Sequence, residues 1–76
     1  MIGMDMTMVA ANIRAARARK DINQGDLAKA IGVNIATVSS YERGEIVPGA
    51  DKVFAMARAL DVTPNDILGW HTSKAA

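Results

Sequence analysis

Apolar residues in the middle of the chain recur at helical spacing, in two short runs on either side of a glycine. The positions are Leu27, Ala28, Ile31, Val33, Val38 and Tyr41. Separations of three and four residues place each set on one face of a helix. Gly32 can adopt the left-handed conformation that ends a helix, and Asn34 can cap the next one with its side-chain oxygen. The pattern predicts two helices of about eight residues joined by a tight turn.

Three further helices are expected around this pair, over about residues 7–20, about residues 50–60 and from Thr63 onward. The buried stripes predicted for the first two are Val9, Ile13 and Ala16, and then Val53, Phe54, Ala57 and Leu60, with Met56 at the border. Thr63 followed by proline and an acid is a helix-start pattern. We therefore predict an all-α fold, a compact bundle of five short helices with a central helix-turn-helix.

The length of 76 residues predicts a single domain. We expect a flexible leader over residues 1–6, the helical domain over residues 7–70 and a flexible tail over residues 71–76. No apolar stretch is long enough to span a membrane. The chain has no cysteine, which fits a reducing compartment, so we expect a cytoplasmic protein without membrane association.

The charge pattern is mildly basic in the first half. The net charge is +1, with six basic and four acidic residues (net +2) over residues 1–44 and three basic and four acidic residues (net −1) over residues 45–76. This distribution is compatible with binding a polyanion but does not establish it.

Catalytic and metal-binding patterns are lacking in the sequence. The single histidine, His71, stands in the predicted tail, and no carboxylate pair or glycine-rich phosphate loop is present. Without cysteine, a thiolate metal site is excluded. We predict no enzymatic activity, no cofactor and no metal.

With these elements in place, the chain resembles the lambda-repressor-like helix-turn-helix family, also called Cro/CI-type or XRE-type DNA-binding domains. The resemblance spans about residues 9–70. It is carried by Ile13, Arg17, Gln24, Leu27, Ala28, Ile31, Gly32, Val33, Thr37, Val38, Tyr41, Glu42, Arg43, Gly44, Pro48 and the turn Leu60-Asp61-Val62-Thr63. The resemblance implies that the helix over about residues 34–43 enters the major groove of DNA.

Site residues follow from the resemblance. It implies an ion pair between Arg17 and Glu42 that ties the recognition helix to the scaffold. The residues implied to contact DNA are Gln24, Asn34, Ile35, Ala36, Thr37, Ser39, Ser40 and Arg43. Ile35 and Ala36 can touch only apolar features such as thymine methyls, whereas serines accept or donate to several base edges. Discrimination per contact is therefore expected to be modest, with a share for DNA shape.

Weak binding by one copy predicts dependence on a second copy. Glu45 stands where relatives often carry a basic residue, and it would repel phosphate. The last helix is rich in apolar residues, so Ile67, Leu68 and Trp70 are candidates for a dimer interface, or alternatively close the core. A two-fold dimer places its recognition helices about 34 Å apart.

The predicted function is that of a sequence-specific regulator of transcription that binds double-stranded DNA, a repressor acting as a homodimer. Two alternatives stay open. One is an antitoxin-type autoregulator, with a toxin or an antirepressor as protein partner. The other is a protein-interaction module that kept the fold without DNA binding.

Overall fold

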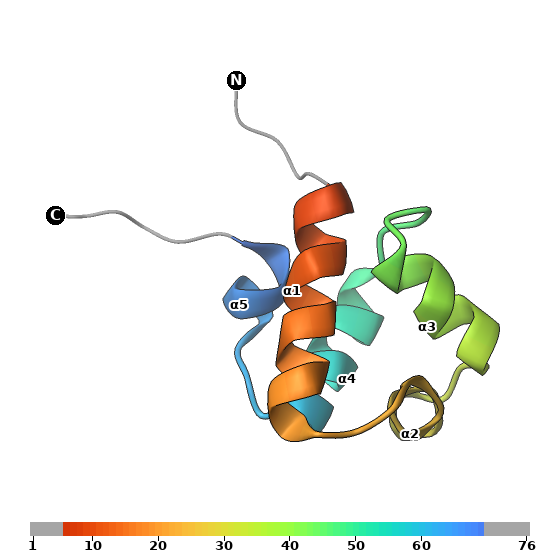
Figure 1. Ribbon diagram of the computed structural model, residues 1–76. Coiled ribbons are helices and arrows are strands. Elements are labelled where there is room, and N and C mark those ends of the chain that lie inside the picture. The colour runs from red at the N-terminus through yellow and green to blue at the C-terminus, as the bar shows by residue number, and fades with distance from the viewer. Residues whose placement is uncertain (1–5, 70–76) are drawn as a thin grey trace, which may run out of the picture.

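The computed structural model describes residues 6–69, which form five helices and no strand (Figure 1). The helices are α1 (Met6–Lys20), α2 (Gln24–Ile31), α3 (Ile35–Glu42), α4 (Ala50–Leu60) and α5 (Pro64–Leu68). The predicted all-α bundle is thus confirmed. The predicted leader and tail lie largely outside the described residues, except that Met6 already belongs to α1.

Helix α1 forms the centre of the bundle. In Figure 1 it runs between α5 on one side and the α2–α3 pair on the other, and it packs against α3, α4 and α5. Val9, Ile13 and Ala16 are buried along it, as the spacing predicts, together with Ala10. Asn12 donates a side-chain hydrogen bond of 3.0 Å to the carbonyl of Ile67, which ties α1 to the end of α5.

The buried face of α4 differs from the prediction at one position. Phe54 is 60% exposed, whereas Met56 is fully buried with Val53, Ala57 and Leu60. Two stripes fit the spacing equally well, since residues 54 and 56 lie on opposite sides of the Val53–Ala57 line. Packing of α4 against α2, α1 and α5 turns the side of Met56 inward, where an unbranched, flexible side chain fits an irregular interior. The predicted burial of Phe54 is therefore wrong.

Local capping chemistry sets the helix ends as the sequence suggests. Thr63 and Asp66 form the predicted capping box at the start of α5, including the reciprocal bond from the Thr63 amide to the Asp66 carboxylate at 2.9 Å. Asp61 ends α4 in the left-handed conformation, with φ of 59°. Each cap satisfies backbone groups that a helix terminus leaves unpaired.

No helix within residues 6–69 is both long and apolar enough to cross a membrane.

Candidate nucleic-acid interface

The helix-turn-helix unit is held by polar caps at both of its helix starts. Asn23 accepts a hydrogen bond of 2.8 Å from the amide of Asp26 and completes a capping box at the start of α2. Gly32 ends α2 with φ of 77°, a left-handed conformation that glycine adopts without a side-chain clash. Asn34 then accepts a bond of 3.1 Å from the amide of Thr37 at the start of α3. These local bonds determine the turn between the helices.

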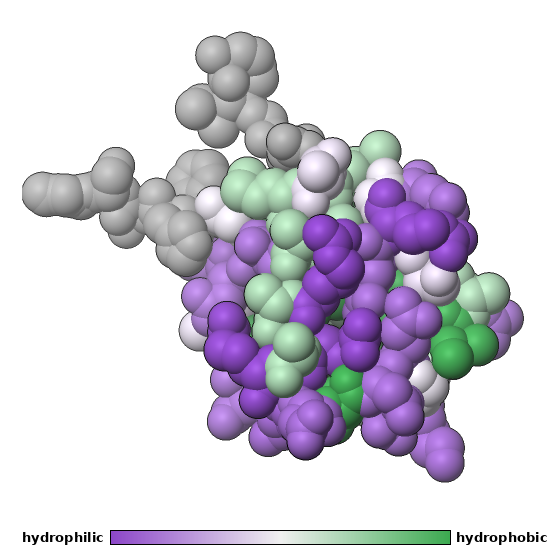
Figure 2. Space-filling view, viewed as in Figure 1, coloured by the Kyte–Doolittle hydropathy of each residue, from purple (hydrophilic) through white to green (hydrophobic). Residues whose placement is uncertain are grey.

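Helix α3 buries one face and presents the other to solvent. Val38 is fully buried and Tyr41 is 5% exposed, so both point into the core as predicted. The predicted DNA-contacting residues of α3 and its cap all lie at exposed or half-buried positions, namely Asn34, Ile35, Ala36, Thr37, Ser39 and Ser40. In Figure 2, hydrophilic side chains cover most of the face that includes α3, with hydrophobic atoms in small separate areas. The unit therefore offers one accessible, mostly polar helix face.

The starts of α2 and α3 lie close together. A methyl group built on Gly25 would be 3.8 Å from the Cδ1 atom of Ile35. This proximity brings Gln24, one of the residues predicted to contact DNA, next to the first residue of the exposed helix. Two segments expected to contact DNA are thus adjacent.

Arg17 and Glu42 form the ion pair that the resemblance implies. Two bonds join the guanidinium to the carboxylate, from Nε to Oε2 at 2.6 Å and from NH2 to Oε1 at 2.9 Å. Glu42 is the only charged or polar residue among those classed as buried within residues 6–69, at 3% exposure. The two-pronged geometry fixes the end of α3 against α1.

Two further side chains converge on Glu42, and sequence reasoning missed both connections. Gln24 donates from Nε2 to Oε1 of Glu42 at 3.0 Å, and Arg14 donates to the Glu42 carbonyl. The position of Arg14, one helical turn before Arg17, was the available signal. The carboxylate of Glu42 thus links α1, α2 and α3 in one network.

The ionisation of Glu42 is governed by opposing effects. Burial by itself raises the pKa of this carboxyl, but hydrogen bonds from Arg17 and Gln24, with the nearby positive charge, lower it below its ordinary value. A carboxyl whose pKa is lower in the folded state than in the unfolded chain stabilises the fold above its unfolded pKa. That stabilisation is lost as the pH falls through the folded pKa.

We expect acid to destabilise the domain through Glu42. The free energy of unfolding should decline as the pH drops below about 4.3, the ordinary value for a glutamate, because the unfolded chain then binds a proton that the folded carboxylate resists. Urea titrations between pH 7 and pH 3 measure this slope. The Glu42→Gln variant should be less stable over the whole pH range, and its free energy of unfolding should depend less steeply on pH. An unchanged pH dependence would contradict the attribution of this effect to Glu42.

Arg43 is engaged in a second network at the end of α3, which the sequence did not reveal. Its Nε and NH2 atoms donate to the two carboxylate oxygens of Glu45 at 2.8 and 3.0 Å. Its NH1 atom donates to the hydroxyl of Ser39. Gly44, with φ of 76°, turns the chain so that Glu45 comes beside Arg43. Both charged side chains are more than half exposed, so the pair is open to solvent.

The predicted interface residues of α5 have different environments. Ile67 is fully buried in the core of its own chain, so it has no surface to offer a partner. Leu68 is half-buried and borders an apolar pocket. Trp70 lies outside the described residues. For Ile67, the burial agrees with the alternative that this residue closes the core.

No group of three or more histidine, aspartate or glutamate side chains able to hold a metal ion occurs in the described part of the chain. The exposed face of α3, backed by the Glu42 network, is the feature that carries the candidate site.

Comparisons with known proteins agree with this geometry. The family model described as helix-turn-helix matches residues 13–67. Repressor protein C2 of Salmonella phage P22 is 32% identical over 65 residues, which are 86% of this chain and 30% of that protein. The chain thus spans less than a third of the length of this relative.

Solved structures show the same likeness. The P22 c2 repressor protein, crystallised in complex with a synthetic operator, superposes with a TM-score of 0.76 at 33% identity, covering 80% of this chain and 92% of that one. The restriction-modification controller protein C.AhdI from Aeromonas hydrophila superposes with a TM-score of 0.78 at 27% identity, covering 83% and 96%.

These proteins are a repressor and a controller protein rather than enzymes, which confirms the prediction that the chain is not an enzyme. The helix-turn-helix family model matches more than half of the chain, residues 13–67. The chain belongs to the lambda-repressor-like (Cro/CI-type) helix-turn-helix family of DNA-binding transcription regulators.

Proposed function

We propose that this chain is a sequence-specific repressor that binds double-stranded DNA as a homodimer, with α3 in the major groove. The observation that carries the proposal is the accessible face of α3, held rigidly by the network around Glu42. A side chain can read a base edge only if its helix is fixed relative to the phosphate contacts. Gln24 is the first residue of α2, and its backbone N–H is suited to a phosphate contact, because the free N–H groups at a helix N-terminus attract phosphate.

The proposed readers differ along α3. Ile35, 54% exposed, and Ala36 lie in its first turn, where they are suited to thymine methyl groups. Ser39 and Ser40 lie one turn further on and are suited to polar base edges. Asn34 and Thr37 bond to each other at the helix start, which suits them to a position beside the DNA backbone.

Few basic side chains near α3 are free for phosphate. Arg14 and Arg17 are used by Glu42, and Arg43 is paired with Glu45. We therefore expect weak non-specific binding by one copy. The logarithm of the association constant for duplex DNA should fall linearly with the logarithm of the salt concentration. The slope should be about −0.9 for each phosphate that the protein neutralises.

Two measurements test the function together. Selection from a pool of random duplexes should enrich one sequence with two-fold symmetry, and a salt titration on that sequence should give the linear decline. Binding that is absent or insensitive to salt would contradict the proposal and favour the protein-interaction alternative. The antitoxin alternative, with a toxin as partner, shares the DNA-binding step and has no separate structural support.

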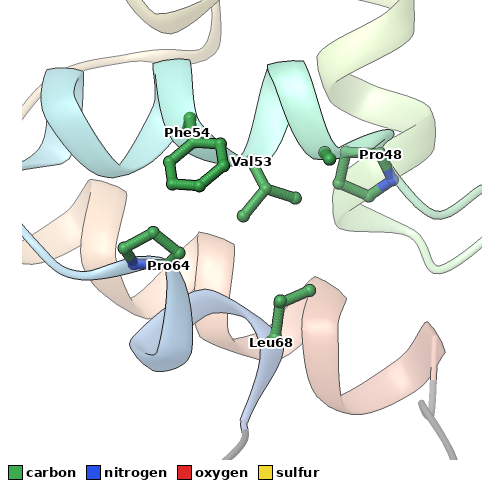
Figure 3. A pocket seen from close by; sticks show the side chains of 6 residues that line it. Pro48, Val53, Phe54, Pro64 and Leu68 are labelled. Atoms are coloured by element: carbon green, nitrogen blue, oxygen red, sulfur yellow. The ribbon is translucent and has the colours of Figure 1, made fainter.

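The dimer contact is proposed at an apolar pocket between α4 and α5. The pocket has a volume of about 210 Å³ and is lined by Pro48, Ala50, Val53, Phe54, Pro64 and Leu68. Figure 3 shows side chains of α4 facing those of α5 across it. Phe54 is the most exposed of the large hydrophobic side chains within residues 6–69. A second copy that covers Phe54 would remove this apolar area from water, which is the usual driving force of association.

Replacing Phe54 by serine tests the dimer contact. We expect the dissociation constant of the dimer to rise by at least about ten-fold, because a largely buried phenylalanine contributes roughly 1.5–3 kcal/mol. Stability of the separate subunit should stay nearly unchanged, since the ring is exposed there. Analytical ultracentrifugation measures the dimer. Ile46→Ser is the matched control, because Ile46 is 46% exposed but lies outside the pocket; equal effects of the two variants would contradict the assignment.

A further inference from the structure

The described part of the chain leaves one face of α4 uncovered. Helices α1, α2 and α5 pack against the other sides of α4. The open face, called here the α4 face, has the positions i, i+3, i+4 and i+7 that share one side of a helix, namely Asp51, Phe54, Ala55 and Arg58. All four residues are exposed or half-buried. Phe54 also lines the apolar pocket, and Figure 3 shows its ring opposite Pro64 of α5. The α4 face is therefore continuous with the surface proposed for the dimer contact.

Opposite charges stand at the two ends of the α4 face. Asp51 lies in the first turn of α4 and Arg58 in the last turn, about 10 Å apart along the helix axis. The side chain of Asp51 is 80% exposed, and its only salt bridge within residues 6–69 is a long one of 3.7 Å to the adjacent Lys52. Arg58 is exposed and forms no salt bridge within the same residues. Both charges are therefore available to a partner.

The α4 face is complementary to itself under two-fold symmetry. In a two-fold contact between identical chains, residue i meets residue j and residue j meets residue i. Asp51 comes three residues before Phe54, and three residues also separate Ala55 from Arg58 further on. Two antiparallel copies of α4 can therefore share a two-fold axis that passes between Phe54 and Ala55. Asp51 of each copy then lies beside the partner's Arg58. Phe54 of each copy lies beside the partner's Ala55, whose small side chain lets the helices approach.

We propose that the dimer forms by antiparallel packing of α4 against α4 of a second copy, with two reciprocal ion pairs between Asp51 and Arg58. Phe54 supplies the apolar contact that drives association, and the charges select the orientation. The opposite orientation, with like residues side by side, brings two Asp51 carboxylates together and two Arg58 guanidinium groups together, which is repulsive. This inference rests on the proposed homodimer and specifies its contact.

The two charges also have an effect within one chain. An acid in the first turn of a helix and a base in the last turn each complement the dipole of that helix. This effect contributes to the free energy of unfolding of the single chain and is the same with or without a partner. The role of Asp51 and Arg58 in the dimer is therefore separable from their role in the helix, because the first requires a second copy.

Single charge changes are the first test. Asp51→Lys and Arg58→Glu each bring like charges together twice, so the dissociation constant of the dimer should rise by at least about 30-fold. Asp51→Asn only removes the attraction, and a rise of about three- to ten-fold is expected. Sedimentation equilibrium of the full chain, or cooperativity on a two-fold duplex, measures the dimer. Arg19→Glu is the matched control, because Arg19 is exposed in the last turn of α1, outside the α4 face. Its dimer constant should stay within about two-fold of wild type, since exposed charges outside the contact are screened.

Mixing the two reversed variants is the decisive experiment. A heterodimer of Asp51→Lys with Arg58→Glu pairs the new lysine with the new glutamate and the remaining aspartate with the remaining arginine, so opposite charges meet at both ends. We expect the heterodimer constant to lie within about three-fold of the wild-type dimer constant, while each variant alone stays monomeric at the same concentration. Charges that act only within their own helix would not be restored by mixing, because each chain keeps its own defect. Urea unfolding of each single variant measures that defect separately.

The outcomes separate this inference from the proposed function. If the wild-type chain dimerises but the reversals leave its constant unchanged, or the mixture stays monomeric, the α4 contact alone is wrong. A tighter dimer in Asp51→Asn also contradicts it, since like residues then meet. If the wild-type chain stays monomeric both alone and on the selected duplex, the proposed homodimer fails and this inference fails with it. If the reversals and the mixture behave as expected but no duplex is enriched, the DNA-binding proposal fails and the contact stands.

Discussion

Replacing Arg17 by methionine is expected to lower the free energy of unfolding by about 3 kcal/mol, the usual cost of removing one partner from a buried ion pair. Glu42, at 3% exposure, would keep only Gln24 as a side-chain partner. A chain of this size has a total stability on the order of 4–11 kcal/mol at roughly 0.05–0.15 kcal/mol per residue. The loss is therefore a large fraction of the whole, and urea unfolding followed by circular dichroism measures it.

A compensating variant distinguishes an ion pair from simple packing. Arg17→Met combined with Glu42→Leu removes both charges, so most of the lost stability should return, because no uncompensated charge is then buried. Arg19→Met is the matched control, since Arg19 is exposed on the same helix. If Glu42→Leu fails to recover stability in the Arg17→Met background, the loss of stability in Arg17→Met is not caused by the uncompensated charge of Glu42.

The second large effect concerns the reading face. Ser40→Glu is expected to reduce affinity for the selected duplex by at least about 100-fold, because a carboxylate facing the DNA adds like-charge repulsion worth several kcal/mol. The free energy of unfolding should change by less than about 0.5 kcal/mol, as usual for a surface substitution. Gel-shift titration and thermal melting provide the two measurements.

The control for this variant adds the same charge elsewhere. Asn65→Glu places a carboxylate on the exposed start of α5, which lies on the far side of α1 from α3 (Figure 1). Its DNA affinity should stay within about three-fold of wild type, since exposed charges farther away than about 10 Å are screened. A large loss of stability in Ser40→Glu would instead mean that Ser40 faces the core, and undiminished binding would mean that α3 is not the reader.

Arg17→Met and Ser40→Glu together test whether the residues that position α3 are separate from those that contact DNA. Glu42, on the buried side of α3, and Arg17 of α1 fix the position of α3, whereas Ser40 lies on its accessible face. Stability loss is therefore expected from the first variant and loss of DNA affinity from the second. An intermediate pattern in both would show that the reading face and its support are not separable.

Much of this protein was predictable because its determinants are local. The caps at Asn23, Asn34 and Thr63 act within three residues, and Gly32 allows its turn by its own backbone freedom. Such short-range effects can be predicted from the sequence without knowledge of the fold. The family resemblance added the long-range pair of Arg17 and Glu42, which spacing alone would not have connected.

Tertiary structure decided what these local patterns left open. The periodicity of α4 allowed either Phe54 or Met56 to be buried, and only packing against the neighbouring helices chose Met56. Gln24 and Arg14 reach Glu42 across 18 and 28 residues of chain, a separation that no local pattern reports.

The group around Glu45 combines both levels. Ser39 and Arg43 are four residues apart, which is a local helical pairing. Glu45 joins them only because Gly44, in a left-handed conformation, reverses the chain beyond the helix end. The sequence by itself determined five helices, side-chain caps at the starts of α2, α3 and α5, and a helix-turn-helix. The tertiary structure decided which side chains that unit leaves free for DNA, because their hydrogen-bond partners depend on where the chain turns.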